Sequence, residues 1–361
     1  MPVAHVDLDA LRSNFDLLRG RLSPACRVLA AVKADGYGHG AVAVARELEA
    51  AGCDWFGVAT TEEALELRQG GVEGRILLFG PVFNRIPELV AADVALTVPG
   101  FEALEAVRAS GVSGARLHLK VDTGMGRLGH PPAEALELAR QLDREPGVIL
   151  EGVWTHFARA DELDRTFTGT QIELFASFLD ELQREGLRPE LAHACNSAGL
   201  LAYPEAHFEM GRPGISLYGY PPDEVMTDLA PTLKPVMTVT APVTFVKRVP
   251  AGTSLSYGGS WTAERETTIA TVRIGYADGY PRVVGNRASA SIRGELVKVA
   301  GRVCMDQLMI DVGDLDLQPG ERVTLFGPEG PTAAELGSLA GTVSYEILTS
   351  VGPRVKREYN R

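Results

Sequence analysis

The chain has 361 residues, of which 45% are hydrophobic and 23% charged, and its formal net charge at pH 7 is -12. This length exceeds the size at which a single hydrophobic core keeps growing, so we expect two domains. The acidic residues are spread through amphipathic segments, which argues against a nucleic-acid-binding protein because such proteins present a basic face.

Short apolar runs alternate with amphipathic stretches from about residue 10 to residue 215. Asp9 is predicted to cap a helix with apolar residues Leu11, Phe15 and Leu18. Eight runs have the texture of buried strands, at 28–32, 55–59, 76–79, 94–98, 117–121, 152–157, 191–195 and 208–211. Helical patterns lie between most of them, at 41–50, 61–69, 101–109, 133–142 and 171–184. This alternation is typical of a (β/α)8 TIM barrel, a fold of the α/β class.

Beyond residue 233 the pattern changes to Val, Thr and Ile alternating with polar residues, in short runs separated by Gly and Pro. Runs at 236–249, 267–274, 288–292 and 297–299 predict a mostly-β C-terminal domain. Thr332 and Glu335 form a capping-box pattern that predicts a short helix. A second helix or turn is expected around Tyr345. We therefore predict a barrel domain at 1–230 and a β domain at 231–361, with residues 1–9 as candidates for pairing with the β domain.

Lys33 ends the first predicted strand and precedes a glycine-rich turn that carries Tyr37. A lysine desolvated at a strand end has a lowered pKa, which makes its amine nucleophilic enough to form a Schiff base. The carbonyl cofactor that best fits such a lysine is pyridoxal 5′-phosphate. An ordinary surface lysine after a strand stays open as the alternative at this point.

The other predicted strand ends also supply polar side chains, at the end of a barrel where active sites lie. They are Lys120, Asp122 and Arg127 on the fifth strand, His156 on the sixth, Asn196 and Ser197 on the seventh, and Arg212 on the eighth. Unpaired buried charges are too costly for such a set to be a packed core. The loops after strands seven and eight, around Ser197 and Gly214, combine a hydroxyl with small residues and predict a phosphate site.

Six segments together resemble the motifs of alanine racemase, in that family's order and along the whole chain. They are 31–40, 118–127, 155–157, 196–197, 254–258 and 301–307. The resemblance implies an isomerase that interconverts L-alanine and D-alanine on pyridoxal phosphate and supplies D-alanine for peptidoglycan. It also implies a homodimer whose active sites are shared between chains.

The resemblance assigns roles to individual residues. Lys33 is the Schiff-base lysine. The cofactor's phosphate is bound by Tyr37, Ser197, Gly214, Ile215 and Tyr345, while Arg212 faces the pyridine nitrogen and His156 and Asn196 complete the cofactor site. Arg127 reaches the cofactor's phenolic oxygen and the substrate, oriented by Lys120, a position that is carbamylated in many family members.

Racemisation removes the α-proton from one face of a planar intermediate and returns a proton to the other, so two acid–base groups must flank the cofactor. Lys33 serves one face. Tyr257, in a glycine-rich turn of the β domain, is the best candidate for the other, although a phenol is a poor base unless nearby cations lower its pKa. The resemblance places Tyr257 in the partner's active site, with Lys33 serving D-alanine and Tyr257 serving L-alanine. Met305 and Tyr276 would enter from the partner as well.

Three alternatives stay open. A racemase with a wider pocket would act on another small amino acid such as serine. A regulatory protein that carries pyridoxal phosphate without turnover would need no second base such as Tyr257. A metallohydrolase barrel would need a His-x-His at the first strand end, where Lys33 stands, so we expect no metal site.

Cysteine usage and the N-terminus bear on localisation. The four cysteines are widely spaced without a C-x-x-C pair, and we interpret them as reduced thiols. The N-terminus lacks the basic and apolar regions of a signal peptide, and no apolar stretch is long enough to cross a bilayer. We therefore expect a cytoplasmic protein that binds neither membrane nor nucleic acid.

Overall fold

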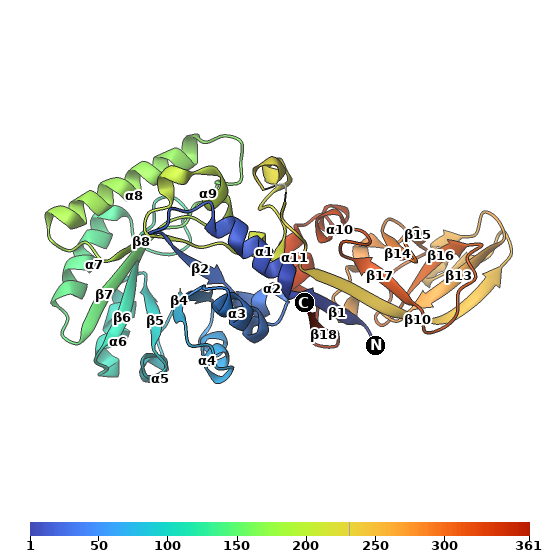
Figure 1. The fold of residues 1–361 in the computed structure, drawn as a ribbon, viewed down its shortest axis with the longest axis horizontal. Helices are drawn as coiled ribbons and strands as arrows, with labels where there is room; N and C mark the ends of the chain where they lie inside the picture. Colours follow the sequence, from blue (N-terminus) through green and yellow to red (C-terminus); the bar gives the residue numbers. More distant parts are fainter. Residues whose placement is uncertain (231) are drawn as a thin grey trace. The chain divides into compact units, whose positions relative to one another are not determined.

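A computed structural model describes residues 1–230 and 232–361. Pro231, at the predicted domain boundary, lies outside the described residues. The chain forms two compact units (Figure 1). The C-terminal unit comprises residues 1–10, 37–40 and 235–361, and the barrel unit comprises residues 11–36 and 41–234.

Eight parallel strands form the sheet of the barrel unit, in the order β8-β7-β6-β5-β4-β3-β2-β9. Their bounds are β2 Arg27–Ala31, β3 Trp55–Val58, β4 Arg75–Pro81, β5 Val94–Val98, β6 Ala115–Lys120, β7 Val148–Trp154, β8 Leu191–His193 and β9 Met210–Gly211. Each predicted run overlaps one of these strands. The amide of Glu209 donates to the carbonyl of Ala192 (3.1 Å) and that of Arg212 to the carbonyl of Cys195 (2.9 Å), so the segments of β8 and β9 nearly close the barrel. The barrel prediction is confirmed.

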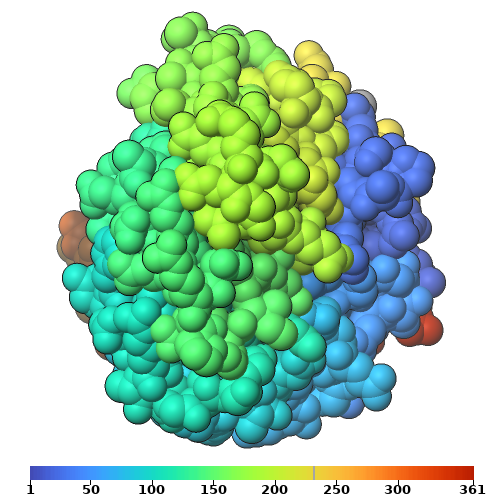
Figure 2. Space-filling model, turned by 90° about the vertical axis from the view of Figure 1, so that its left-hand side faces the viewer, coloured from blue at the N-terminus to red at the C-terminus, as the bar shows by residue number. Residues whose placement is uncertain are grey.

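Helices cover the outside of these strands (Figure 1). They are α3 Ala41–Ala50, α4 Thr61–Gln69, α5 Ile86–Ala91, α6 Phe101–Ser110, α7 Pro132–Arg144, α8 Thr166–Arg184 and α9 Ser197–Ala202. Figure 2 shows consecutive segments of the barrel unit following one another around one face, from blue through cyan and green to yellow-green. Apolar side chains from the strands fill the interior, among them Leu29, Trp55, Leu77 and Leu191.

The first helix, α1 (Leu8–Arg19), starts earlier than the sequence predicts. β1 (Val3–Asp7) runs directly into it, and the carboxylate of Asp7 accepts a hydrogen bond from the amide of Ala10 (2.8 Å). The prediction that Asp9 is the cap is therefore wrong, because the strand brings the capping position to Asp7.

The main sheet of the C-terminal unit has eight strands in the order β13-β16-β15-β14-β17-β10-β1-β18, and β13 also pairs with β10. The bounds are β10 Met237–Val249, β13 Thr267–Val272, β14 Ser289–Ile292, β15 Glu295–Val299, β16 Leu308–Gly313, β17 Arg322–Phe326 and β18 Lys356–Asn360. β1 lies between β10, with which it is antiparallel, and β18, with which it is parallel. The chain's two ends therefore meet in one sheet.

Two helices complete the C-terminal unit, α10 (Ala333–Ala340) and α11 (Ser344–Thr349). The predicted capping box opens α10: the hydroxyl of Thr332 accepts from the amide of Glu335 (3.0 Å), and the Glu335 carboxylate accepts from the amide of Thr332 (2.6 Å). α11 contains Tyr345, as the sequence predicts.

Close packing between β6 and β7 leads to a stability prediction. A Cβ atom on Gly152 would lie 2.3 Å from Nδ1 of His118. We expect Gly152→Ala to lower the free energy of unfolding by about 1–3 kcal/mol, the usual cost of overpacking a core. Urea denaturation measures the change.

Gly169 in α8 provides the matched control, since a Cβ there would meet nothing within 4 Å. Gly169→Ala should raise the free energy of unfolding by roughly 0.5–1 kcal/mol because alanine loses less backbone entropy in a helix. Equal effects of the two substitutions would contradict the packing argument.

Candidate active site

The carboxyl ends of the barrel strands bring together the polar residues that the sequence singles out. Lys33 follows β2 by two residues, Lys120 is the last residue of β6, and His156 follows β7. Asn196 and Ser197 open α9 after β8, and Arg212 directly follows β9. The predicted location of these residues is therefore correct, and their chemistry depends on their surroundings.

Lys33 is half-buried and stands before a left-handed turn. The φ angles of Ala34, Asp35, Gly36 and Tyr37 are 52°, 54°, 60° and 53°. Burial, followed by the positive charge of Arg127, lowers the pKa of the Lys33 amine, while the carboxylate of Glu63 opposes this shift. A lowered pKa favours the neutral, nucleophilic amine.

Lys120 is almost completely buried, and its Nζ donates to the carbonyl of Val121 (2.6 Å). Burial, together with Arg212 and Arg127, lowers its pKa to about 7, although Asp122 acts in the opposite direction. No ion pair within 4 Å joins Lys120 to an acid among the described residues. Lys120 is thus partly neutral at physiological pH.

The carboxylate of Asp122 serves the loop that follows β6 instead of pairing with Lys120. It accepts hydrogen bonds from the amides of Gly124 (2.9 Å) and Gly126 (3.0 Å). The next residue is Arg127, which is exposed. Asp122 therefore shapes the turn that presents the Arg127 side chain.

Arg212 is a buried cation without a carboxylate partner among the described residues. Its guanidinium donates to the carbonyls of Thr155 (2.8 Å) and Ala194 (2.9 Å), and lies 3.3 Å from Nδ1 of His156 and 3.0 Å from Nδ1 of His193. Burial lowers its pKa to about 10, so it stays protonated at neutral pH. Burial and the charge of Arg212 also hold the pKa of His156 well below its usual value, which keeps that imidazole neutral.

A hydrogen-bonded chain connects Arg212 to Glu151 in β7 through two buried histidines. Because guanidinium only donates, Nδ1 of His193 must accept, and its Nε2 then donates to Nδ1 of His118 (2.9 Å). Nε2 of His118 donates in turn to the carboxylate of Glu151 (3.2 Å). Both histidines are fully buried, and burial lowers their pKa values. They are neutral, each with one defined tautomer.

The sequence analysis did not identify this chain of hydrogen bonds. One signal was present: His118 precedes Lys120 by two residues, and residues two apart on a strand share a face. His118 therefore had to point into the barrel with Lys120. The stacking of His193 on Trp154, with ring centroids 5.9 Å apart and planes within 4°, gave no sequence signal.

Ser197 is placed to organise the backbone after β9. Its hydroxyl oxygen accepts from the amides of Gly214 (2.8 Å) and, more weakly, Ser216 (3.4 Å). Ile215, between them, is fully buried. Asn196 uses its side-chain oxygen to cap α9 through the amide of Gly199 (2.9 Å), so its observed contact is a capping contact.

Two predicted phosphate ligands belong to the C-terminal unit. The rings of Tyr37 and Tyr345 have centroids 6.2 Å apart. Tyr37 is buried, and burial raises its pKa to about 12, so its phenol is protonated and can donate a hydrogen bond.

The predicted second base, Tyr257, is 70% exposed and starts a 3-10 turn, Tyr257–Gly259. The preceding Ser256 has a φ of 69° and exchanges hydrogen bonds with the backbone of Arg302: its hydroxyl accepts from the amide (2.9 Å) and donates to the carbonyl (3.2 Å). The loop of Arg302 continues to Met305, which is also exposed. The amide of Tyr276 donates to the carbonyl of Cys304 in that loop (3.0 Å). Tyr257, Met305 and Tyr276 therefore lie on connected, exposed loops of one unit.

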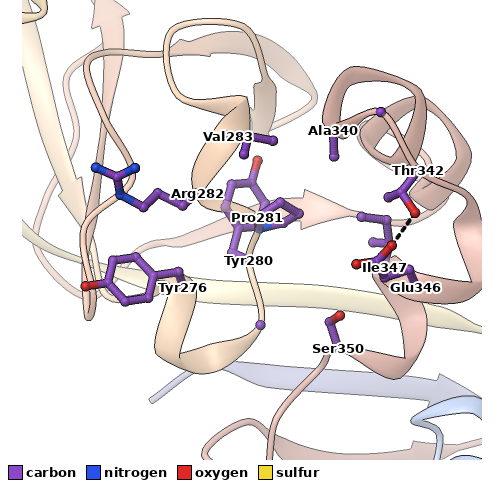
Figure 3. Close-up of a pocket in the computed structure, with 12 residues that line it drawn as sticks. Tyr276, Tyr280, Pro281, Arg282, Val283, Ala340, Thr342, Glu346, Ile347 and Ser350 are labelled. Atoms are coloured by element: carbon purple, nitrogen blue, oxygen red, sulfur yellow. Dashed lines mark hydrogen bonds between the residues drawn. The ribbon is translucent and has the colours of Figure 1, made fainter.

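The C-terminal unit also contains a cavity of about 580 Å³ (Figure 3). Its lining includes Tyr276, Tyr280, Arg282, Val283 and Glu346. The Glu346 carboxylate accepts a hydrogen bond from the hydroxyl of Thr342, drawn as a dashed line in Figure 3. None of the predicted phosphate-binding residues lines this cavity, so it is not the predicted cofactor site.

Within residues 1–230 and 232–361, no group of three or more His, Cys, Asp or Glu side chains is arranged to hold a metal ion. No helix in these ranges combines the length and the apolar character that a membrane span requires.

Comparison with known proteins covers almost the whole chain. The family model described as "Alanine racemase, N-terminal domain" matches residues 6–222, and "Alanine racemase, C-terminal domain" matches residues 236–359. The alanine racemase of Symbiobacterium thermophilum is 46% identical over 366 residues, covering 99% of this chain and 96% of that protein. That of Desulforamulus reducens is 40% identical over 362 residues, with coverages of 99% and 98%.

Solved structures agree with these sequence matches. The alanine racemase from D-cycloserine-producing Streptomyces lavendulae superposes with a TM-score of 0.93 at 40% identity, covering 100% of this chain and 97% of that chain. The enzyme from Bacillus anthracis, solved with bound L-Ala-P, has a TM-score of 0.94 at 35% identity, with coverages of 100% and 95%.

The buried Lys120 leads to a prediction about pH and stability. Its pKa falls from 10.5 to about 7 on folding. Below pH 7 the folded protein holds a buried cation. As the pH rises from 7 toward 10.5, the folded lysine loses its proton before the unfolded one does, so stability rises.

We therefore expect Lys120→Met to stabilise the full chain most at low pH. The gain should be roughly 2–4 kcal/mol at pH 6 and smaller by about 2 kcal/mol at pH 9. Urea denaturation in CO2-free buffer at both values measures it. Lys298→Met, at an exposed lysine of β15, should show no such difference. A gain at Lys120 that does not vary with pH would contradict the lowered pKa.

Proposed function

The chain belongs to the alanine racemase family, and we propose that it interconverts L-alanine and D-alanine on pyridoxal 5′-phosphate with Lys33 and Tyr257 as the two bases. The observation that carries this proposal is the set of groups at the carboxyl end of the barrel. Lys33 has a lowered pKa, and Arg212 is a buried cation whose hydrogen-bond acceptors among the described residues are all neutral. A cofactor with a reactive carbonyl for Lys33 and a pyridine nitrogen that accepts a hydrogen bond from Arg212 suits both.

The residues present fit pyridoxal phosphate. When bound, this cofactor withdraws electrons from the α-carbon of an amino acid and makes its proton removable. Ser197, Gly214 and Ile215 would hold the phosphate, with Tyr37 and Tyr345 as further donors. Small residues allow close backbone approach there, and the protonated phenol of Tyr37 is suited to donate to an anion.

Arg212 would face the pyridine nitrogen beside His156, with Asn196 as a further member of the cofactor site. An arginine that stays protonated cannot give that nitrogen a full proton, so the ring accepts less negative charge. Reprotonation at the α-carbon is then favoured over side reactions. The neutral chain of His193 and His118 fixes the orientation of Arg212 for this role.

The proton transfers belong to two side chains. In the conversion of D-alanine to L-alanine, Nζ of Lys33 would remove the α-proton. In the conversion of L-alanine to D-alanine, it would donate a proton to the α-carbon on that same face. Oη of Tyr257 would serve the face of L-alanine. Arg127 would bind the substrate and the cofactor's phenolic oxygen.

We also propose a homodimer in which Tyr257, Met305 and Tyr276 act in the partner's site. In support, these side chains are large, exposed and carried by connected loops of one unit. Exposed apolar side chains gathered in this way are typical of interaction surfaces. By the resemblance, the product D-alanine would enter peptidoglycan, and the enzyme would act in the cytoplasm.

Lys120 is proposed to carry a carbamate. Carbamylation needs a neutral amine, and a pKa of about 7 supplies it at physiological pH. The added negative charge would lie near Arg212 and Arg127, whose charges lower the pKa of Lys120. It would orient Arg127 toward the cofactor.

The first functional prediction concerns Lys33. Lys33→Ala should lose both the yellow colour of the bound cofactor and racemase activity, because the covalent anchor and one base disappear together. Absorbance spectra and conversion of L-alanine to D-alanine measure the two effects. Lys298→Ala, at an exposed lysine of β15, should keep both. A coloured, active Lys33→Ala protein would rule out the assignment.

The second functional prediction concerns Tyr257. Tyr257→Phe should keep the colour and lose conversion of L-alanine to D-alanine, together with exchange of the α-proton of L-alanine with solvent. Exchange of the D-alanine proton through Lys33 should continue. Proton NMR in D2O follows both exchanges, with Tyr359→Phe as a control in β18.

Mixing two inactive variants tests the shared site. In a heterodimer of Lys33→Ala and Tyr257→Phe chains, one of the two sites combines Lys33 with the partner's intact second base. Random re-association should therefore restore about one quarter of wild-type activity. Full activity of Tyr257→Phe alone, or no recovery on mixing, would contradict the two-base dimer.

A further inference from the structure

The left-handed turn after Lys33 is a strained segment at the centre of the candidate site. Left-handed conformation costs a non-glycine residue roughly 1–2 kcal/mol, and Ala34, Asp35 and Tyr37 all adopt it in succession. Such strain persists only where surrounding contacts determine the conformation. The contacts that hold this turn therefore decide where the Lys33 backbone points.

Two carboxylates bond to backbone amides at this turn. Asp35 accepts from the amide of Ala41 (2.9 Å), where the chain enters α3. Glu63 accepts from the amide of Ala34 (2.7 Å), the residue directly after Lys33. The second contact joins α4 to the first residue of the strained turn.

Glu63 divides its two carboxylate oxygens between two tasks. Oε2 accepts from the amides of Ala59 (2.7 Å) and Thr60 (3.2 Å), which completes the capping box of α4. Oε1 makes no contribution to that cap and bonds to Ala34, 29 residues earlier in the chain. A capping box needs only one of the two carboxylate oxygens, as Glu335 shows at the start of α10, where Oε2 accepts from the amide of Thr332.

We propose that Glu63 is a positioning residue for Lys33, whose second carboxylate oxygen holds the left-handed turn and thereby fixes the lysine for proton transfer. This inference rests on the proposed function for its kinetic part only. Glu63 does not touch the reacting atoms; it acts through the Ala34 amide.

The charges around Lys33 agree with this placement. Arg127 lowers the pKa of the amine and Glu63 raises it, and the positive charge of Lys33 in turn lowers the pKa of His156. Of the described side chains that shift the pKa of Lys33, Arg127 is a base and Glu63 is the acid. Its carboxylate thus lies close enough to both the turn and the amine to affect each.

Hydrogen exchange on the full-length holoenzyme directly tests the hydrogen bond between Glu63 and the amide of Ala34. Glu63→Ala should remove the protection of the Ala34 amide, read by NMR or by mass spectrometry of the peptide that contains it. Glu335→Ala removes the matched capping acid of α10 and should leave Ala34 protected. If Glu63→Ala does not fold, Glu63→Asp keeps the charge on a shorter side chain, and we expect the same loss of protection.

Kinetics separate positioning from a general loss of structure. The kcat of Glu63→Ala should fall by about 10-fold or more because a displaced base is inefficient, while KM changes less than about threefold. The isotope effect with α-deuterated D-alanine should increase, since the Lys33 step becomes slower, and that with α-deuterated L-alanine should decrease. A structural defect would not favour one enantiomer.

Unchanged protection of Ala34 in the variants would overturn the proposal, and so would isotope effects that change equally for both enantiomers. Failure of the proposed function has a different signature. In that case the wild-type protein shows no racemisation, and the exchange experiment still decides whether Glu63 holds the turn.

Discussion

The barrel interior is organised around one buried cation, the guanidinium of Arg212. No carboxylate among the described residues pairs with it, and its hydrogen bonds go to two backbone carbonyls and two imidazoles. Because guanidinium cannot accept a hydrogen bond, it determines the tautomer of His193, which determines that of His118. The negative charge at the far end, on Glu151, pairs with Arg75 and Arg116 near the other end of the strands. One side chain thus sets the protonation pattern across the barrel.

The candidate site is locally positive in a protein whose net charge is -12. Lys33, Lys120, Arg127 and Arg212 lie near enough to affect one another's pKa values or that of His156. Crowded cations destabilise a folded protein, and an anion that binds only the folded state recovers that free energy. The phosphate of the proposed cofactor would be such an anion. For binding of an anionic cofactor, the local cations therefore outweigh the repulsion from the protein's net negative charge.

The sequence predicted much of this arrangement because it follows from short-range patterns. Apolar runs located the eight barrel strands, and the strand ends located Lys33, Lys120 and Arg212. What it missed depends on contacts between distant segments. The hydrogen-bonded chain from His193 to Glu151 depends on how β6, β7 and β8 align with one another. The hydrogen bond from the Ala34 amide to Glu63 joins residues 29 apart in the sequence. The incorrect prediction that Asp9 caps the first helix has a different cause. β1 ends at Asp7 and α1 begins at Leu8, so no loop residues mark the start of the helix in the sequence.

The position of β1 has a consequence for the order in which the protein is made. This strand is synthesised before both of its neighbours, which are far along the chain: Val3 pairs with Thr240 and with Lys356. At typical synthesis rates of about 5–20 residues per second, β1 waits on the order of 10–50 s for its first partner. The second partner, β18, follows still later, at Lys356–Asn360. The barrel can therefore fold during translation, whereas the sheet that contains β1 can be completed only once β18 has been synthesised.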